Sequence, residues 1–319
     1  MTDADLIIEV AALYYINRLT QDDLARQFGT SRSTISRLLK QAHDTGVVEI
    51  QVRARPDRAR RIEQELQTRF GLSRLLCAID LFDPVNRRLN VASMVAGYLD
   101  KVLVDGTTVA VGMGRNVSAI TEASGLPLPR DVLFVSAIGG SVQSGEMVNA
   151  DHIARRLAAR FRGRSETLYA PAIVEDETLR LALLRNDNVR RTLDRARGAS
   201  IALLGVGDMT EDSNMIRMGW LSPREVARAQ ATGTVGDILG NDFIDIQGRP
   251  SRTIVAGRVV GLTLKDLEAI EDVVVVAAEN TKIGILLGVL RTGVVDTLAT
   301  TLSNAQGVLD LDDATRGDR

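Results

Sequence analysis

From Leu72 onward, short β-rich apolar runs alternate with longer helical segments. We predict strands at Leu75–Ile79, Thr107–Val111, Val132–Ala137, Thr167–Ala170, Ile201–Leu204 and Val273–Ala277, and helices at Arg88–Val104, Asn149–Phe161, Asn188–Ala196 and Lys282–Arg291. Strands separated by helices pair in parallel, and helices cover both faces of a parallel sheet. The alternation therefore predicts a doubly wound α/β domain over residues 72–319, with a disordered end after Asp310.

The length of 319 residues allows a second domain before this one. The apolar fraction of 45% and the charged fraction of 25% are typical of a soluble globular protein, and the net charge of −2 gives no global indication of nucleic-acid binding. The single cysteine excludes a disulfide framework and a cysteine-rich zinc site, so we expect neither metal nor cofactor. No run approaches transmembrane length and no signal peptide is visible, so we expect a cytoplasmic protein without membrane contact.

The segment from Gln21 to Lys40 predicts two short helices joined by a tight turn. Gly29 suits the turn because it adopts positive φ at low cost, and Ser31 is a good N-cap for the second helix. Apolar residues at helical spacing face inward from both helices: Leu24, Ala25, Phe28, Ile35, Leu38 and Leu39. An ordinary helical hairpin would share this period, but the small Ala25 and the turn Gly29 at this spacing favour a helix-turn-helix.

The outward face of the second helix is polar and cationic near its beginning, where a recognition helix meets bases and phosphates. We expect operator contacts from Gln21, Ser31, Arg32, Ser33, Thr34, Ser36, Arg37 and Lys40. The β-rich segment Gly46–Val52 predicts the strand of a winged module, so the DNA-binding domain is expected to span residues 1–54.

Residues 55–71 predict a linker helix between the two domains. Within it, Asp57–Phe70 carries one apolar stripe on a polar helix: Ala59, Ile62, Leu66 and Phe70. This stripe is compatible with pairing to a second copy of the chain or with packing on the following domain, and the sequence leaves both open.

Three predicted strands are followed by turns that contain glycines: Gly112-Met113-Gly114-Arg115, Gly139-Gly140-Ser141 and Gly205-Val206-Gly207-Asp208. Ligands of open α/β sheets bind beyond the carboxyl ends of the strands, and glycines let backbone N–H groups approach an anion there. The turns predict a phosphate-bearing ligand. A dinucleotide is disfavoured because Val117 stands where the third glycine of the G-x-G-x-x-G fingerprint belongs.

The chain resembles the SorC-type sugar-binding transcriptional regulators, which include the deoxyribonucleoside regulator of bacilli. The matching segments are YYINRLTQDDLARQFGTSRSTISRLLKQAHDTGVVEIQV, VAVGMGRNVSAI, YAPAIV, ALLGVGDM and GWLSPREVARAQATGTVGDILGNDFIDIQG. The resemblance implies an effector domain with the fold of sugar-phosphate isomerases. It also implies a homodimer or homotetramer whose operator binding is changed by a small-molecule effector, a phosphorylated sugar or polyol.

Several effector-site residues follow from this resemblance. They are Gly112, Gly114 and Arg115 in the phosphate turn, Gly140 and Ser141 in a second ligand loop, Gly207 and Asp208 in the GVGD motif, Asp237 in the GDILG turn, and Lys282 at the start of the last large helix. Family members often carry a glycine pair shortly before that lysine, whereas this chain has Ala278 and Glu279. We expect Glu279 to lie in the site and either to pair with Lys282 or Arg115 when the site is empty or to accept ligand hydroxyls. Ala299-Thr300-Thr301 is a second departure, since it replaces a frequent I-T-D.

Two functions fit such a chain: a ligand-controlled DNA-binding regulator, or a sugar-phosphate isomerase or deaminase fused to a DNA-binding module. Aldose–ketose chemistry needs a positioned general base, often with a histidine or carboxylate partner. The chain has two histidines, His43 near the end of the recognition helix and His152 at the head of another helix. Lys282 suits a Schiff base or pairing with a phosphate, and we favour the pairing. We expect a regulator of a carbohydrate or polyol catabolic operon without enzymatic activity.

Overall fold

The computed structural model describes residues 3–48, 56–124, 127–141, 148–211, 213–240, 242–251, 255 and 257–316. It contains two compact units, a smaller one formed mainly by Met1–Val52 and a larger one that begins at Arg53. Each unit is described by itself.

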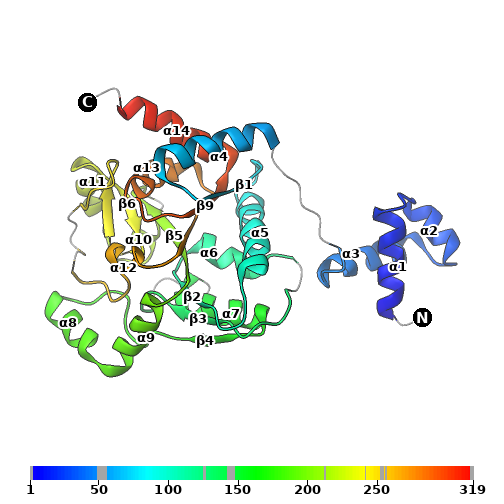
Figure 1. Cartoon of the computed structure of the whole chain (residues 1–319), viewed down its shortest axis with the longest axis horizontal. Coiled ribbons are helices and arrows are strands. Elements are labelled where there is room, and N and C mark those ends of the chain that lie inside the picture. Colours follow the sequence, from blue (N-terminus) through cyan, green and yellow to red (C-terminus); the bar gives the residue numbers. More distant parts are fainter. Residues whose placement is uncertain are drawn as a thin grey trace. The chain divides into compact units, whose positions relative to one another are not determined.

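The smaller unit consists of three helices, α1 (Asp3–Tyr15), α2 (Gln21–Gln27) and α3 (Arg32–Asp44) (Figure 1). Their common core is formed by Val10, Leu24, Ile35 and Leu39, which are all buried. The predicted helical pair and its inward residues are confirmed. Most of the predicted wing strand lies outside the described residues, which resume at Pro56.

The larger unit is built on a sheet whose main strands are all parallel and follow the order β1-β9-β8-β5-β2-β3-β4. These strands are β1 (Arg74–Ala78), β2 (Thr108–Val111), β3 (Leu133–Ser136), β4 (Arg164–Glu166), β5 (Ile201–Asp208), β8 (Asp272–Val276) and β9 (Thr297–Thr301). A hairpin of β6 (Thr234–Ile238) and β7 (Asp242–Asp245) pairs antiparallel with the end of β5. The predicted doubly wound fold is confirmed.

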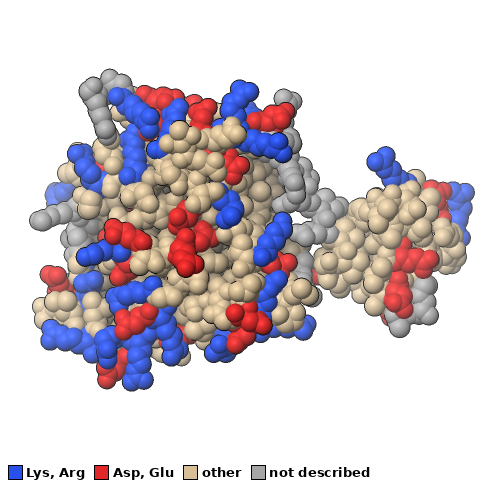
Figure 2. All heavy atoms as spheres, in the orientation of Figure 1, with Lys and Arg blue, Asp and Glu red and all other residues tan. Residues whose placement is uncertain are grey.

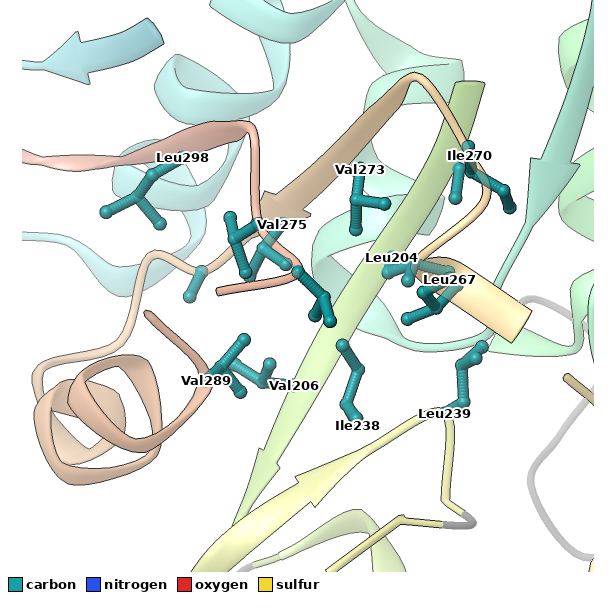
Figure 3. Close-up of a cluster of buried hydrophobic side chains, with 14 of the residues drawn as sticks. Leu204, Val206, Ile238, Leu239, Leu267, Ile270, Val273, Val275, Val289 and Leu298 are labelled. Carbon is teal, nitrogen blue, oxygen red and sulfur yellow. The ribbon is translucent and has the colours of Figure 1, made fainter. Parts of the chain in front are cut away.

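Helices cover both faces of this sheet. One face carries α5 (Pro84–Val102), α6 (Arg115–Ala119) and α7 (Ala150–Phe161), and the other carries α4 (Pro56–Phe70), α9 (Asp187–Arg197), α13 (Ile283–Arg291) and α14 (Leu302–Arg316). Shorter elements are α8 (Glu177–Arg185), α10 (Asn214–Arg217), α11 (Pro223–Ala231), α12 (Leu264–Leu267) and the 3-10 turns Ile120–Glu122 and Asn280–Lys282. Figure 3 shows the second face, where Leu204, Val275 and Val289 of β5, β8 and α13 meet in one buried cluster.

The linker helix α4 packs on the larger unit through two residues of its apolar stripe. Ile62 and Leu66 are buried in the main core, and α4 lies beside α14 at the surface (Figure 1). For these two residues, packing on the following domain is therefore the correct interpretation of the stripe.

Three sequence predictions need correction, and three strands were missed. Thr167–Ala170 is not a strand, because the edge strand β4 ends at Glu166. Residues 311–316 are helical as the end of α14, because Asp312 is buried and held there by arginines. The Gly205–Asp208 segment is part of β5 and not a turn, because β6 pairs with it. The strands β6, β7 and β9 were not predicted.

Candidate DNA-binding surface and effector pocket

The turn between α2 and α3 is fixed by local hydrogen bonds. Thr20 and Asp23 form a capping box at the start of α2, and the Ser31 hydroxyl accepts from the Thr34 N–H, 3.1 Å away, at the start of α3. Gly29 between the helices has φ +62°, a conformation that favours glycine. These caps hold the beginning of α3 at a defined angle to α2.

The outward face of α3 matches the predicted recognition face. Arg32, Ser33, Ser36, Arg37 and Lys40 are exposed, whereas Gln21 and Thr34 are half-buried. Ser31 is exposed but its hydroxyl serves the cap, and Arg32 lies 3.9 Å from Asp22 and 3.5 Å from the Gln21 Oε1. Arg37 and Lys40 make no ion pair with the described residues, so their charges are available to a partner.

The end of α3 is anchored to α1 by a contact that the sequence prediction missed. Tyr15 Oη lies 2.7 Å from His43 Nε2, with the two rings edge to face. A tyrosine in one helix and a histidine 28 residues later give no local pattern, so only the fold reveals this pair.

The larger unit has a pocket at the carboxyl ends of β2, β5 and β8. Between β2 and β5 the direction of strand succession reverses, and open α/β sheets bind ligands at such a switch point. The pocket has a volume of about 50 Å³ and is lined by Met113, Gly114, Arg115, Asn116, Val148, Gly205, Val206, Gly207, Met215, Met218, Asp237, Leu239, Gly240 and Lys282. Five predicted effector residues therefore meet here: Gly114, Arg115, Gly207, Asp237 and Lys282.

Lys282 is buried, and its ammonium is already engaged within the pocket wall. Its Nζ donates to the Val206 carbonyl at 2.7 Å and lies 3.5 Å from Glu279 Oε2. The lysine ends the 3-10 turn Asn280–Lys282, and its N–H donates to the Glu279 carbonyl. Lys282 is also the N-cap of α13, so it stands at the start of this helix as expected, while its own N–H is used by the 3-10 turn.

Glu279 connects the pocket to α5 and α6. Its Oε1 accepts from Arg88 at 3.0 and 3.2 Å, and its Oε2 accepts from Asn116 Nδ2 at 2.8 Å. Burial raises the pKa of Glu279, but Lys282, Asn116 and Arg88 together outweigh burial and lower the pKa to about 2. Glu279 pairs with Lys282 as expected, while its second cation is Arg88 and not Arg115.

Asp237 is a buried carboxyl that faces the pocket with one oxygen unpaired. Its Oδ2 accepts from the Gly240 N–H at 2.8 Å, whereas no described atom donates to Oδ1. Burial raises its pKa to about 6, against the lowering effect of the Gly240 N–H and of Lys282. Gly207 is its partner across β5 and β6, and a Cβ there would lie 2.1 Å from Oδ1. Gly207 is thus needed to make room for Asp237.

The other predicted effector residues do not line the pocket. Gly112 donates its N–H to Leu203 and Gly140 to Ala170, both at 2.9 Å, so neither N–H is free for an anion. The Ser141 N–H donates to Asn149 Oδ1. Asp208 accepts from the hydroxyls of Thr210 and Thr281, at 2.7 and 2.6 Å.

Among the lining residues that were not predicted, Asn116 and Leu239 are the most informative. Asn116 is buried, and no described atom donates to its Oδ1. Leu239 has φ +58°, a backbone conformation that is strained for a residue with a bulky side chain. Both stand in motifs that were recognised, Asn116 directly after Arg115 and Leu239 two residues after Asp237. The sequence analysis recognised these motifs but selected too few of their residues.

The pocket combines cationic groups with buried hydrogen-bond acceptors. Arg115 makes no ion pair or hydrogen bond with the described residues, and Asp237 and Asn116 each offer an acceptor oxygen. Such a set suits a small molecule with hydroxyl donors and an anionic group. The described residues include no histidine, cysteine or carboxylate cluster that could hold a metal, and no described helix is long and apolar enough to cross a membrane.

A helix-turn-helix unit joined to an α/β unit with such a pocket defines the class of ligand-responsive transcriptional regulators. Two family models match, "Putative sugar-binding domain" over residues 54–310 and the Crp-like helix-turn-helix domain over residues 6–62. The chain therefore belongs to the SorC-type family of sugar-binding transcriptional regulators.

On the face seen in Figure 2, acidic and basic side chains are interspersed over the larger unit, without a broad basic surface.

Curated relatives match over nearly the whole chain. The transcriptional regulator LsrR of Enterobacter sp. (strain 638) is 30% identical, over 98% of this chain and 94% of the relative. The sorbitol operon regulator of Klebsiella pneumoniae is 26% identical, over 96% and 98% of the two chains. The crystal structure of that full-length SorC has a TM-score of 0.76 and 25% identity, covering 97% of this chain and 99% of that one.

The sugar-binding domain of a transcriptional repressor from Vibrio fischeri has 44% identity and a TM-score of 0.74 over 79% of this chain and 99% of that chain. Together with the helix-turn-helix unit, these matches identify the chain as a DNA-binding transcriptional regulator.

Proposed function

We propose that this regulator controls a carbohydrate or polyol catabolic operon and that a phosphorylated sugar or polyol, bound in the switch-point pocket, changes its hold on operator DNA. The observation that carries the proposal is the buried Asp237, one oxygen of which has no donor among the described residues, in a pocket that the cations Arg115 and Lys282 also line. Sugar hydroxyls donate to a carboxylate, and a phosphate forms charge-assisted hydrogen bonds with arginine and lysine.

Two acceptors define where the hydroxyl end of the effector binds. Asp237 Oδ1 and Asn116 Oδ1 are buried and receive no hydrogen bond from the described residues, and leaving a buried polar atom unpaired costs about 1–3 kcal/mol. An effector that donates to both recovers that cost. The cavity of about 50 Å³ is smaller than the ~300 Å³ of typical ligand sites, so binding requires lining side chains to move. That movement is the source of the signal in this proposal.

We propose no enzymatic activity for this pocket. Its described lining contains no histidine, and the lysine that would form a Schiff base donates to a backbone carbonyl and faces a carboxylate. A Schiff base requires an amine nitrogen that is free to attack a carbonyl, whereas this nitrogen is engaged by the Val206 carbonyl and lies beside Glu279. The relatives, moreover, are named as regulators of transcription.

The proposal includes assembly, location and domain roles. Residues 1–54 would bind DNA, 55–71 would form the linker, and 72–319 would bind effector and oligomerise. One recognition helix reads few base pairs, so a homodimer or homotetramer that binds half-sites about 34 Å apart, or a multiple of this, is required for a specific operator. Such a protein acts in the cytoplasm.

A thermal-shift screen of sugars, polyols and their phosphates tests the function. A ligand at a hundredfold excess over its Kd stabilises the folded state by about 2.7 kcal/mol, which raises Tm by several degrees. We expect a phosphorylated compound to raise Tm and to change operator affinity. Compounds that raise Tm without changing operator affinity, or a panel without any stabilising member, would argue against the proposal.

A further inference from the structure

Glu279 is the meeting point of four separate elements at the edge of the pocket. It follows β8, and its carboxylate contacts Arg88 of α5, Asn116 of α6 and Lys282 before α13. Its side chain is 19% exposed. Its two oxygens have different partners: Oε1 contacts Arg88, and Oε2 contacts Asn116 and Lys282. A carboxylate so enclosed acts as the counterion of a cationic cluster.

Glu279 pairs with both Arg88 and Lys282 when no ligand is present. Asp237 and Arg115 line the same pocket as Lys282, and Arg115 makes no ion pair with the described residues. A phosphate group that approaches Lys282 would also approach Glu279, because these two side chains are 3.5 Å apart. Like charges repel strongly at such distances in a partly buried site.

We propose that Glu279 is a resident anion that competes with the effector: the effector's anionic group binds at Lys282 only by replacing the Glu279 carboxylate there. This inference rests on the proposed function and specifies how the same pocket selects its ligand. Glu279 thereby lowers the affinity of the pocket for anions in general. A bare phosphate binds weakly, and a ligand must also supply hydroxyl groups for Asp237 and Asn116.

The exchange is physically feasible because Glu279 keeps a partner when it leaves Lys282. Arg88 holds the opposite oxygen and lines a neighbouring cavity of about 180 Å³ together with Arg115. Breaking a buried ion pair is costly chiefly when it leaves a charge unpaired. Here Glu279 stays paired with Arg88 and Lys282 pairs with the anionic group of the ligand, so both charges keep a partner. The pKa of Glu279, lowered to about 2, keeps its carboxylate ionised throughout the physiological range, so Glu279 itself remains a charged competitor there.

The experiment measures inorganic phosphate binding to the full-length protein by calorimetry and by Tm shift. We expect Glu279→Gln, which removes the charge and keeps the size, to bind phosphate at least about tenfold more tightly than wild type. The gain should disappear in the double variant with Lys282→Gln. Glu122→Gln is the matched control, because Glu122 also lines the neighbouring cavity but pairs with Arg156, and it should leave phosphate affinity unchanged.

Phosphate binding is also measured for Glu279→Gly. Either of the two Glu279 variants tests the inference, provided that it melts cooperatively and is therefore folded. Unchanged or weaker phosphate binding in the charge-removed variants would overturn the inference. Operator titration of wild type with the phosphorylated panel separates this result from the proposed function. If wild type responds but Glu279→Gln gains nothing, only the competition fails. If Glu279→Gln gains phosphate and no panel compound affects operator binding, only the proposed function fails.

Discussion

Arg69 of the linker helix α4 donates to Asp312 of α14, a carboxylate whose side chain is only 1% exposed, with Nη1 3.2 Å from Oδ2. The other oxygen of Asp312 accepts from Arg291, the last residue of α13, at 2.8 Å. The same helix α13 begins directly after Lys282 in the pocket. One helix therefore joins the pocket to the residue that holds the linker helix.

We predict that Arg69→Gln weakens communication between effector and operator. Typical coupling energies are 1–3 kcal/mol, and we expect this variant to lose about 1 kcal/mol, so that effector changes operator affinity about fivefold less than in wild type. Arg316→Gln is the control, since Arg316 also contacts Asp312, at 2.9 Å, but from within α14. Operator titrations with and without effector measure both, and equal losses in the two variants would count against a route through α4.

We predict that the buried carboxyl of Asp237 lowers the folding stability of the protein in a pH-dependent way. Burial raises its pKa from the ordinary 3.8 to about 6 in the folded protein, so the folded state retains a proton that the unfolded state loses as pH rises. Stability therefore falls between about pH 4 and 6 and stays lower above, by about 3 kcal/mol in total. Asp237→Asn should raise Tm at pH 8 more than at pH 5 and should abolish effector binding. Thermal melts at the two pH values decide it, and an equal effect at both would refute the buried ionisation.

A larger residue at Gly207 should displace the carboxylate of Asp237 by steric overlap. A Cβ there lies 2.1 Å from Asp237 Oδ1, so Gly207→Ala must displace Asp237, with an expected loss of about 1–3 kcal/mol in stability and loss of the Tm shift with effector. Gly140→Ala is the matched control because a Cβ at Gly140 meets open space. Ligand-induced Tm shifts compare the two, and a Gly140→Ala variant that also loses the shift would place part of the site in the second loop.

The recognition face predicts which residue reads bases. Arg37 is exposed on α3 and makes no ion pair with the described residues, whereas Arg26 pairs with Asp23 at 2.6 Å. Arg37→Ala should cost about 1–3 kcal/mol on operator and little on random DNA, while Arg26→Ala should weaken both alike. Binding isotherms on the two DNAs measure this, and equal losses for Arg37→Ala would make it a phosphate contact.

The sequence was sufficient to predict the elements whose buried residues are apolar. The inward residues of α3 and the strands β1, β2, β3, β5 and β8 were predicted because valine, leucine and isoleucine repeat at the spacing of each element. β9 was missed because three of its five buried residues are threonines, and the Thr300 hydroxyl is accommodated by donating to the Ala277 carbonyl and accepting from Asn304 Nδ2. The end of α14 was missed for the same reason, since a buried Asp312 depends on arginines from distant segments.

The pocket was predictable in location and only partly in composition. Glycines after strands and a recognisable lysine indicated the correct edge of the sheet, but the partners of Lys282 could not be derived from spacing. Arg88 reaches Glu279 across 191 residues, and Asn116 reaches it across 163. The sequence did not indicate that Gly207 makes room for Asp237, because only the pairing of β5 with β6 places Asp237 against it.

The central claim is that the pocket around Lys282 governs operator binding. The most direct measurement is an operator titration of wild type and Lys282→Gln, each with and without the compound that stabilises wild type most in the thermal-shift screen. The variant loses the ammonium that donates to Val206 and faces Glu279, at a site within the effector unit. We predict that its operator affinity without ligand equals that of wild type within about twofold, while the effect of the compound disappears. A variant that still responds to the compound as wild type does would contradict the account.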